Sequence, residues 1–343
     1  MPADTAAAAP QSTVADEGER AVISRIHARL GASPSWAVVG IGDDAAVVEP
    51  VRGALEVLTT DSLVESVHFD LQLSRPFDVG WKALAVNLSD IAAMGAAPRA
   101  ALLSLALPPS LPITAFDELI DGFLALAREH RVLLAGGNIT RSPGPLVVDV
   151  TATGAVRRRD LLRRAGARPG DGVFLTGSVG AGVAGLECLR RGGTDAETEE
   201  MQASVERYRR PAPRSRIGAL LGRSRAASAC MDLSDGLADA AAQVAEASGV
   251  GLRLDASALP IDAGARRWFE RQGKDPAMAA TAGGDDYELL FTVPRKRTGR
   301  LRHVQQEARG VPLTRIGEVT AERGVVLVRD GRPEPLPAGF VHF

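Results

Sequence analysis

Hydrophobic and polar residues recur with both helical and strand-like spacing along the chain, which predicts a mixed α/β protein. The clearest helix runs from Phe77 to Ile91, where Trp81, Leu84 and Leu88 complete an apolar stripe at helical spacing. Other helices are predicted over 19–30 and 115–128, from Gly180, in two stretches up to Leu221, and from Gly236. Strands are predicted over 45–48, 55–60, 101–107, 131–135, 146–152, 173–176, 226–231, 287–293, 313–317 and 325–328.

A basic, turn-rich segment over 157–172, with the sequence RRRDLLRRAGARPGDG, separates two series of these elements. Its first five arginines form either a solvated linker surface or a hinge that contacts phosphate. We place the domain boundary in this segment. The expected organisation is a disordered Ala/Pro-rich leader over 1–18, an N-terminal α/β domain over 19–160 and a C-terminal α/β domain over 161–343.

Composition removes several classes of function. The 343 residues include 40 Lys and Arg against 42 Asp and Glu, a balance that argues against a nucleic-acid or anionic-membrane partner. Two cysteines are too few for a disulfide framework or a Cys-rich zinc site. The longest mostly apolar run, 100–107, is too short to span a bilayer, and no signal peptide precedes it, so we expect a soluble cytoplasmic protein.

Acidic clusters carry the candidate chemistry. They are GDD at 42–44, TTD at 59–61, NLSD at 87–90, DLSDG at 232–236 and GGDD at 283–286. One such cluster alone is most often a turn or a helix cap, and Ser234 and Asp235 are suited to cap the helix that follows them. Five clusters from both halves favour several Mg²⁺ ions that neutralise a polyphosphate, because carboxylate and hydroxyl oxygens suit hard cations. These ions would replace a P-loop lysine, since the only Gly-Lys pair, at 273–274, is followed by Asp275.

Other motifs are weaker. A GxGxxG sequence at 180–185 follows a predicted strand, but the chain continues as a helix where a dinucleotide fold needs a second strand. Close packing of helix and strand explains these glycines better than NAD or FAD binding does. The five histidines form no zinc-binding spacing, no GxSxG elbow occurs, and a lone histidine such as His68 is more often structural than functional.

Taken in order, the motifs resemble those of a known family. GIGDDAAVV, TTDSLVESVHFD, WKALAVNLSDIAAMGAAP, RRAGARPGD, MDLSDGL and GGDDYELLFTV, from about residue 20 to the C-terminus, are similar to thiamine-monophosphate kinases. These kinases belong to the superfamily of aminoimidazole ribonucleotide synthetase and selenophosphate synthetase. The resemblance implies an N-terminal domain that forms a β-barrel-like interface in a homodimer, and a C-terminal α/β sandwich. It also implies direct in-line transfer of the γ-phosphoryl group of ATP to thiamine monophosphate, assisted by several Mg²⁺ ions, as the last step of thiamine diphosphate biosynthesis.

The resemblance further implies site residues. Metal ligands are expected at Asp44, Thr59, Thr60, Asp61, Asp90, Asn138, Asp232 and Asp235. ATP contacts are expected from the Gly137-Asn138 turn, Arg164 and Ser234, and substrate contacts from His68, Asp285 and Phe340. No general base is expected, because the acceptor phosphate is already anionic. Asn138 stands where the family commonly has Asp, and Asp285 where it commonly has Glu.

Two alternatives remain beside the kinase. One is another ATP-using synthetase of the same superfamily, although the first cysteine, Cys188, lies too late for the reactive residue of selenophosphate synthetases. The other is a non-catalytic protein that binds thiamine phosphate or nucleotide, a possibility raised by Asn138 and Asp285. A dinucleotide oxidoreductase is a more distant alternative.

Overall fold

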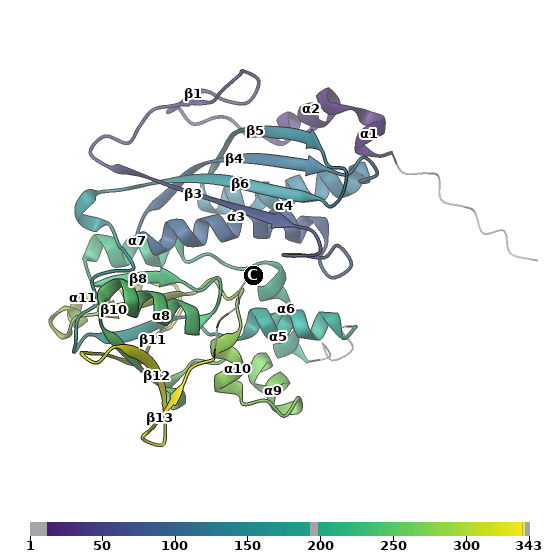
Figure 1. Cartoon of the computed structure of the whole chain (residues 1–343). Helices are drawn as coiled ribbons and strands as arrows, with labels where there is room; N and C mark the ends of the chain where they lie inside the picture. The colour runs from purple at the N-terminus through teal and green to yellow at the C-terminus, as the bar shows by residue number, and fades with distance from the viewer. Residues whose placement is uncertain (1–11, 193–197, 338, 340–343) are drawn as a thin grey trace, which may run out of the picture.

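The computed structural model describes residues 12–192, 198–337 and 339, arranged around two β-sheets (Figure 1). The N-terminal half contains a four-stranded sheet in the order β3-β6-β4-β5, in which only β4 and β5 are parallel. Its elements are α1 (Val14–Glu17), α2 (Glu19–Arg29), β1 (Ala37–Val39), β2 (Val47–Val48), β3 (Leu55–Val64), α3 (Pro76–Ala93), β4 (Ala97–Leu107), α4 (Ile113–His130), β5 (Leu133–Arg141) and β6 (Val147–Val156). No closed sheet occurs among the described residues, so the expected β-barrel is not confirmed for a single chain.

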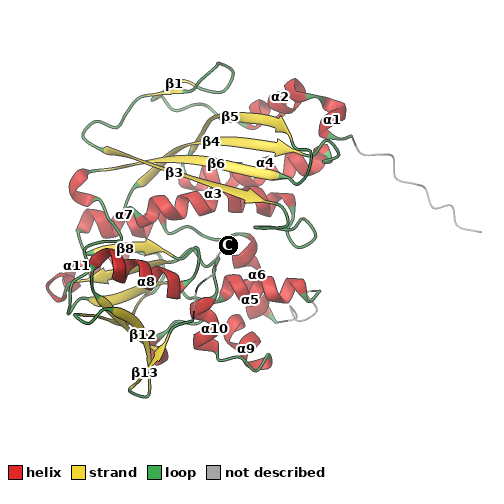
Figure 2. Cartoon of the chain, in the orientation of Figure 1, coloured by secondary structure: helices red, strands yellow, loops and turns green. Residues whose placement is uncertain are grey.

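The long helices α3 and α4 pack together on one face of this sheet (Figure 2). Their backbones touch at two glycines: a Cβ on Gly80 would lie 1.9 Å from the Leu119 carbonyl oxygen, and one on Gly122 would lie 1.9 Å from that of Phe77. Beyond this contact α3 also packs on β3, on β6 and on the second half of the chain, and towards the end of the helix the polar residues Asn87 and Ser89 are fully inaccessible. The helix therefore carries its polar residues into the interior of the molecule.

Much of the opposite face of the sheet is exposed in the single chain, although Trp36 and Glu49 beside the β1–β2 hairpin contact it at Arg99. Along β3, residues alternate between the two faces: Thr59 and Asp61 are partly buried on the side of α3, whereas Leu58 and Thr60 are exposed on the other side. Leu58 is 69% exposed and Leu102 on β4 is 44% exposed. The outer face of the four-stranded sheet thus exposes two large apolar side chains beside polar residues such as Thr60 and Asp149.

The C-terminal half is built on a seven-stranded sheet in the order β13-β12-β9-β11-β7-β10-β8, in which only β9 and β12 are parallel. The strands are β7 (Gly172–Thr176), β8 (Ala229–Asp232), β9 (Gly251–Asp255), β10 (Leu289–Val293), β11 (Leu313–Thr320), β12 (Gly324–Arg329) and β13 (Arg332–Pro335). The helices are α5 (Ala181–Arg190), α6 (Glu199–Arg209), α7 (Ser215–Ser224), α8 (Leu237–Ser248), α9 (Ala263–Arg271), α10 (Pro276–Ala282) and α11 (Thr298–Glu307), with short 3₁₀ turns η1 (Arg158–Asp160), η2 (Ala256–Ala258) and η3 (Arg295–Arg297). Among the helices described, none combines the length and apolar character needed to cross a lipid bilayer.

The two halves share an apolar contact. Ala92 at the end of α3 packs in one cluster with Leu162, Ile217 and Leu221 of the second half. Polar contacts add to it: Trp81 Nε1 donates to the Pro211 carbonyl oxygen at 3.0 Å. This junction fixes α3 against the C-terminal sheet, next to β8 and α7.

Besides shifts in the ends of several strands, the structure departs from the predicted organisation in three places. The 131–135 strand does not end in a Gly137-Asn138 turn but continues to Arg141, because β4 pairs with it throughout. The alternating strand predicted at 287–293 begins at Leu289 and is buried at every residue, since it lies between β7 and β8 inside the sheet. The leader expected over 1–18 is ordered over its last residues, where Val14 is buried and α1 is capped by Thr13.

Candidate active site

Buried acidic side chains from both halves meet at the junction between them. Thr59 on β3 donates a short hydrogen bond to Asp90, which lies in the last turn of α3. The preceding residue, Ser89, donates a 2.8 Å hydrogen bond to Asp232 at the end of β8. Asp90 has no basic residue in its helical turn, and a helix C-terminus disfavours a carboxylate. The fold therefore concentrates negative charge where the two domains touch.

The carboxylates of this cluster are compensated only in part by nearby cations. Burial, followed by the charge of Asp90, raises the pKa of Asp232 to about 7. Burial raises the pKa of Asp61 to about 6, with further contributions from Asp90, Asp149 and Asp235. Burial also raises the pKa of Asp90. Each carboxylate is thus held in a place where a positive partner would stabilise its charged form.

The carboxylates of this cluster suit a hard cation that takes its remaining ligands from water or phosphate. Within the described residues, no group of three His, Cys, Asp or Glu side chains is arranged to hold a metal ion by itself. Mg²⁺, however, is usually bound by one or two carboxylates, several waters and substrate phosphates rather than by a cage of protein ligands. Asp61, Asp90, Asp232 and Asp235 supply such carboxylates from β3, α3 and the segment before α8.

A cavity of about 700 Å³ adjoins the acidic cluster. Its lining includes Asp61, Asp90 and Asp232, together with His68 and Asp285. The His68 ring is fixed because its Nδ1 accepts the Val64 N–H at 3.1 Å. The cavity brings the residues expected to bind metal and acceptor into one space.

The segment before α8 also faces this cavity, through Ser234 and Asp235. Neither caps the helix, so that expectation is wrong: the N-cap is Gly236, at φ +101°, with no side-chain cap hydrogen bond. Glycine is required there, since a Cβ would lie 2.6 Å from the Gly283 carbonyl oxygen. The start of α8 therefore offers backbone N–H groups suited to an anion, beside Ser234.

Some of the residues expected to bind metal or ATP lie farther from the acidic cluster. Arg164 donates to Gln243 and lies near enough to lower the pKa of both Asp90 and Asp232, which joins it to the cluster. Gly137 and Asn138 lie exposed on the edge strand β5 and do not line the cavity. Asp44 is exposed in the loop between β1 and β2.

The two remaining expected residues are Thr60 and Phe340. The Thr60 side chain lies on the outer face of the sheet, with its hydroxyl 3.1 Å from that of Thr151. Phe340 falls outside the described residues.

The structure adds site residues that the sequence did not indicate. Asp149 accepts hydrogen bonds from Thr60 and Ser62 on the outer face of the sheet, and it acts on the site only through its charge, which contributes to the raised pKa of Asp61. Ser89 donates a hydrogen bond to Asp232. Lys82 and Tyr287 both bond to Asp285 in the cavity wall. Lys82 could have been noticed in the sequence, because it is a lysine among the small and apolar residues of its helix.

The glycine-rich turn at 177–182 does not resemble a dinucleotide site. The N–H groups of Gly180 and Gly182 donate to the buried carboxylate of Asp286, at 2.7 and 3.2 Å, which occupies the place of a ligand phosphate. Over the described part of 181–224, helices follow and no strand. The preference for close packing over NAD or FAD binding agrees with this geometry.

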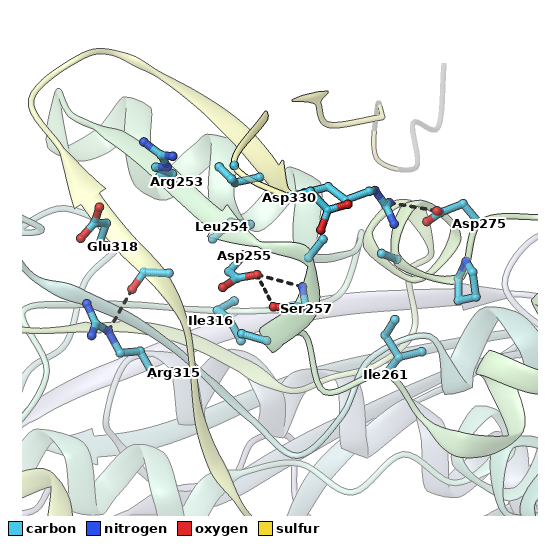
Figure 3. Close-up of a pocket in the computed structure, with 18 of the residues that line it drawn as sticks. Arg253, Leu254, Asp255, Ser257, Ile261, Asp275, Arg315, Ile316, Glu318 and Asp330 are labelled. Carbon is cyan, nitrogen blue, oxygen red and sulfur yellow. Dashed lines mark hydrogen bonds and ion pairs between the residues drawn. The ribbon is translucent and has the colours of Figure 1, made fainter. Parts of the chain in front are cut away.

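A larger cavity, of about 1060 Å³, lies on the C-terminal sheet away from the acidic cluster (Figure 3). Several of its charged residues are already paired: Asp255 accepts from the Ser257 N–H and hydroxyl, and Arg329 pairs with Asp275 at 2.9 Å. Basic and acidic side chains alternate across it, so it lacks the concentrated charge of the interdomain site. The interdomain cavity is the better candidate for catalysis.

Both halves of the chain match known protein-family domains. Residues 42–156 match the AIR synthase related protein N-terminal domain, and residues 168–330 match the corresponding C-terminal domain. Fold and matches together define the chain as an AIR synthase related protein. E. coli HypE, a hydrogenase maturation protein with 20% identity and a TM-score of 0.74, shares this fold.

Nearer relatives are more specific. Thiamine-monophosphate kinase of Salmonella typhimurium is 38% identical over 329 residues, which cover 95% of this chain and 98% of the relative. That of Bacillus subtilis is 38% identical over 82% of this chain and 85% of the relative. The crystal structure of the Stenotrophomonas maltophilia kinase has a TM-score of 0.79 and 37% identity, over 91% of this chain and 95% of its own. AaThiL complexed with AMPPCP and TMP has a TM-score of 0.75 and 34% identity, over 96% of this chain and 98% of its own.

The chain belongs to the thiamine-monophosphate kinase family. It is therefore an enzyme of the phosphotransferase class. The resemblance inferred from its ordered motifs is confirmed.

Proposed function

We propose that the chain transfers the γ-phosphoryl group of ATP to thiamine monophosphate and so forms thiamine diphosphate. The single observation that carries the proposal is the acidic cluster at the wall of the interdomain cavity, in which Asp232 is buried and Asp61 and Asp90 are partly buried. A phosphoryl transfer between two anions needs this arrangement, because its barrier is lowered mainly by neutralising charge and by positioning. The complex of the related AaThiL with AMPPCP and TMP supports the same pair of substrates here.

The proposed mechanism assigns each side of the cavity a task. Asp61, Asp90, Asp232 and Asp235 would hold Mg²⁺, which supplies positive charge to the phosphates. The guanidinium of Arg164 and the start of α8 beside Ser234 would bind nucleotide phosphate. His68 and Asp285 would orient the acceptor from the cavity lining. No residue needs to remove a proton, because the attacking phosphate oxygen is already charged.

We also propose that the chain acts as a homodimer through the outer face of the four-stranded sheet. Leu58 and Leu102 expose large apolar side chains there, and Val47 of the β1–β2 hairpin is 49% exposed. A second copy would cover this surface. The same face carries Thr60, and the exposed strand β5 carries Gly137 and Asn138, so dimerisation would also enclose expected site residues that the single chain leaves exposed. Light scattering at micromolar concentration should give about twice the chain mass of 35.9 kDa, and a monomer would contradict this part of the proposal.

Three expectations from the sequence complete the proposal. The boundary between domains at residues 160 and 161, the number of Mg²⁺ ions and the cytoplasmic location stay predictions. Support for the boundary comes from the two family matches, which end at 156 and begin at 168.

An end-point assay with ATP, Mg²⁺ and thiamine monophosphate tests the reaction. Thiamine diphosphate and ADP should form in equal amounts, and omission of Mg²⁺ should abolish both. Binding of both ligands without turnover would instead indicate a non-catalytic relative. Absence of thiamine monophosphate binding would favour a synthetase of the same superfamily that acts on another substrate.

A further inference from the structure

Lys82 occupies an unusual place in the interdomain cavity. Its side chain is only 5% exposed, although it lies on α3 among residues that pack on the N-terminal sheet. The ammonium Nζ donates to Asp285 Oδ2 at 3.0 Å, from the other half of the molecule. It also lies 4.3 Å from the centre of the Tyr208 ring, on α6. A buried lysine is retained where its charge has partners, and here both partners belong to the C-terminal half.

Asp285 is held on both of its oxygens. Besides the bond from Lys82, Asp285 Oδ1 accepts a 2.9 Å hydrogen bond from the Tyr287 hydroxyl. The backbone N–H of Asp285 donates to Ser234 at 2.8 Å, and that of Tyr287 donates to Leu233 at 2.9 Å. Both residues have positive φ, +65° for Asp285 and +51° for Tyr287, a conformation that side-chain-bearing residues adopt only where surrounding contacts enforce it. The Lys82 contact holds this strained segment from the N-terminal half.

The charges around the cavity give this contact a second effect. Six carboxylates line the cavity: Asp61, Asp70, Asp90, Asp232, Asp235 and Asp285. Among the described residues, the lysine and arginine side chains that line it are those of Lys82 and Arg190. A phosphorylated acceptor entering this space is repelled by every carboxylate that lacks a cation. Because the Lys82 ammonium forms an ion pair with Asp285, it cancels the charge of that carboxylate in the cavity lining.

We propose that Lys82 is a positioning residue for the acceptor substrate, acting through Asp285. It fixes the Asp285 carboxylate at the cavity wall and cancels its charge, so that the acceptor phosphate approaches the acidic cluster. This inference rests on the proposed function, since the acceptor is taken to be thiamine monophosphate. It assigns Lys82 no contact with the transferred phosphoryl group.

The test compares Lys82→Met with Lys274→Met. Lys274 is a matched control because it also forms an ion pair, with Glu187 at 2.8 Å, and lies 6.0 Å from the centre of the Phe269 ring, outside the cavity lining. Lys82→Met should raise KM for thiamine monophosphate at least about tenfold, while KM for ATP changes by less than about threefold. Lys274→Met should leave both constants unchanged. Equal effects of Lys82→Met on both substrates, or none, would overturn the inference.

A double-mutant comparison tests whether Lys82 acts through Asp285. If it does, Lys82→Met combined with Asp285→Asn should bind thiamine monophosphate no more weakly than Lys82→Met alone, because the unpaired charge is gone. Losses that add would overturn the inference. If Lys82→Met does not fold, Lys82→Gln takes its place, since it also removes the positive charge that pairs with Asp285; it too should weaken acceptor binding selectively, and an unchanged KM would overturn the inference.

Calorimetry separates this inference from the proposed function. The dissociation constant of thiamine monophosphate is measured without nucleotide for the unaltered protein and for Lys82→Met. Failure of the unaltered protein to bind would count against the proposed function. Equal binding by both proteins would leave that function intact and overturn the role of Lys82.

Discussion

Ser89 and Asp232 are 143 positions apart in the chain, yet the Ser89 hydroxyl donates a 2.8 Å hydrogen bond to the Asp232 carboxylate across the domain junction. Both residues are buried, Ser89 completely. The bond lowers the pKa of Asp232, against the larger effects of burial and of Asp90, which raise it. It therefore helps to keep a buried carboxylate available in its charged form.

Replacement of Ser89 by alanine should weaken the enzyme most at low pH. Without the donor, the pKa of Asp232 rises above about 7, so less of the free enzyme carries the charged form near neutrality. We expect the acid limb of the pH profile of kcat/KM to move to higher pH, with a stability loss of about 1–3 kcal/mol. Ser224→Ala is the control, because that hydroxyl donates to the Leu220 carbonyl oxygen within α7. An acid limb that stays in place would contradict the prediction.

Replacement of Asp90 by asparagine should separate activity from stability. Burial disfavours the charge of Asp90, whereas asparagine is neutral and can still accept the hydrogen bond from Thr59. Without Mg²⁺, the melting temperature should therefore stay the same or rise by a few degrees, while kcat falls at least about a thousandfold. Asp121→Asn, which removes the exposed partner of Arg29, should leave kcat unchanged. Full turnover by Asp90→Asn would rule out the assigned role.

Substitution of Gly80 tests the packing that places α3. Glycine to alanine inside a helix ordinarily stabilises by about 0.5–1 kcal/mol, and Gly299→Ala in α11 should do so because a Cβ there meets nothing within 4 Å. At Gly80 the sign should reverse, with a loss of about 2 kcal/mol or more, since the Cβ would lie 1.9 Å from the Leu119 carbonyl oxygen. Chemical denaturation of both variants measures the difference. A stabilised Gly80→Ala would show that α3 and α4 can separate without cost.

The sequence predicted the parts of the site that local patterns encode. The stripe from Phe77 to Ile91 defined α3, and the clusters around Asp90 and Asp232 proved to meet, as their number had suggested. Lys82 escaped notice because its partner, Asp285, is 203 positions away, and no local spacing encodes that contact. Thr60 illustrates the opposite failure: it neighbours Asp61 in sequence, but strand alternation places the two side chains on opposite faces.

Protons and Mg²⁺ should compete for the acidic cluster. The carboxyls of Asp61 and Asp232 have pKa values of about 6 and about 7, above the ordinary value of 3.8. Between pH 3.8 and these raised values, the unliganded folded protein therefore binds more protons than the unfolded chain. Its stability without Mg²⁺ should therefore fall as the pH rises from about 4 to 7, because the two carboxyls lose their protons over this range.

Mg²⁺ reverses this dependence, because a metal ion binds only the deprotonated carboxylates. Below pH 6, the apparent Mg²⁺ affinity should weaken by about tenfold per pH unit for each proton released, and the stabilisation that Mg²⁺ confers should grow from pH 6 to pH 8. Melting temperatures over this range, with and without Mg²⁺, measure the effect directly. Asp232→Asn should flatten the dependence, since one of the two titrating carboxyls is then absent. A Mg²⁺ effect that is independent of pH in the unaltered protein would mean that these carboxylates do not hold the metal.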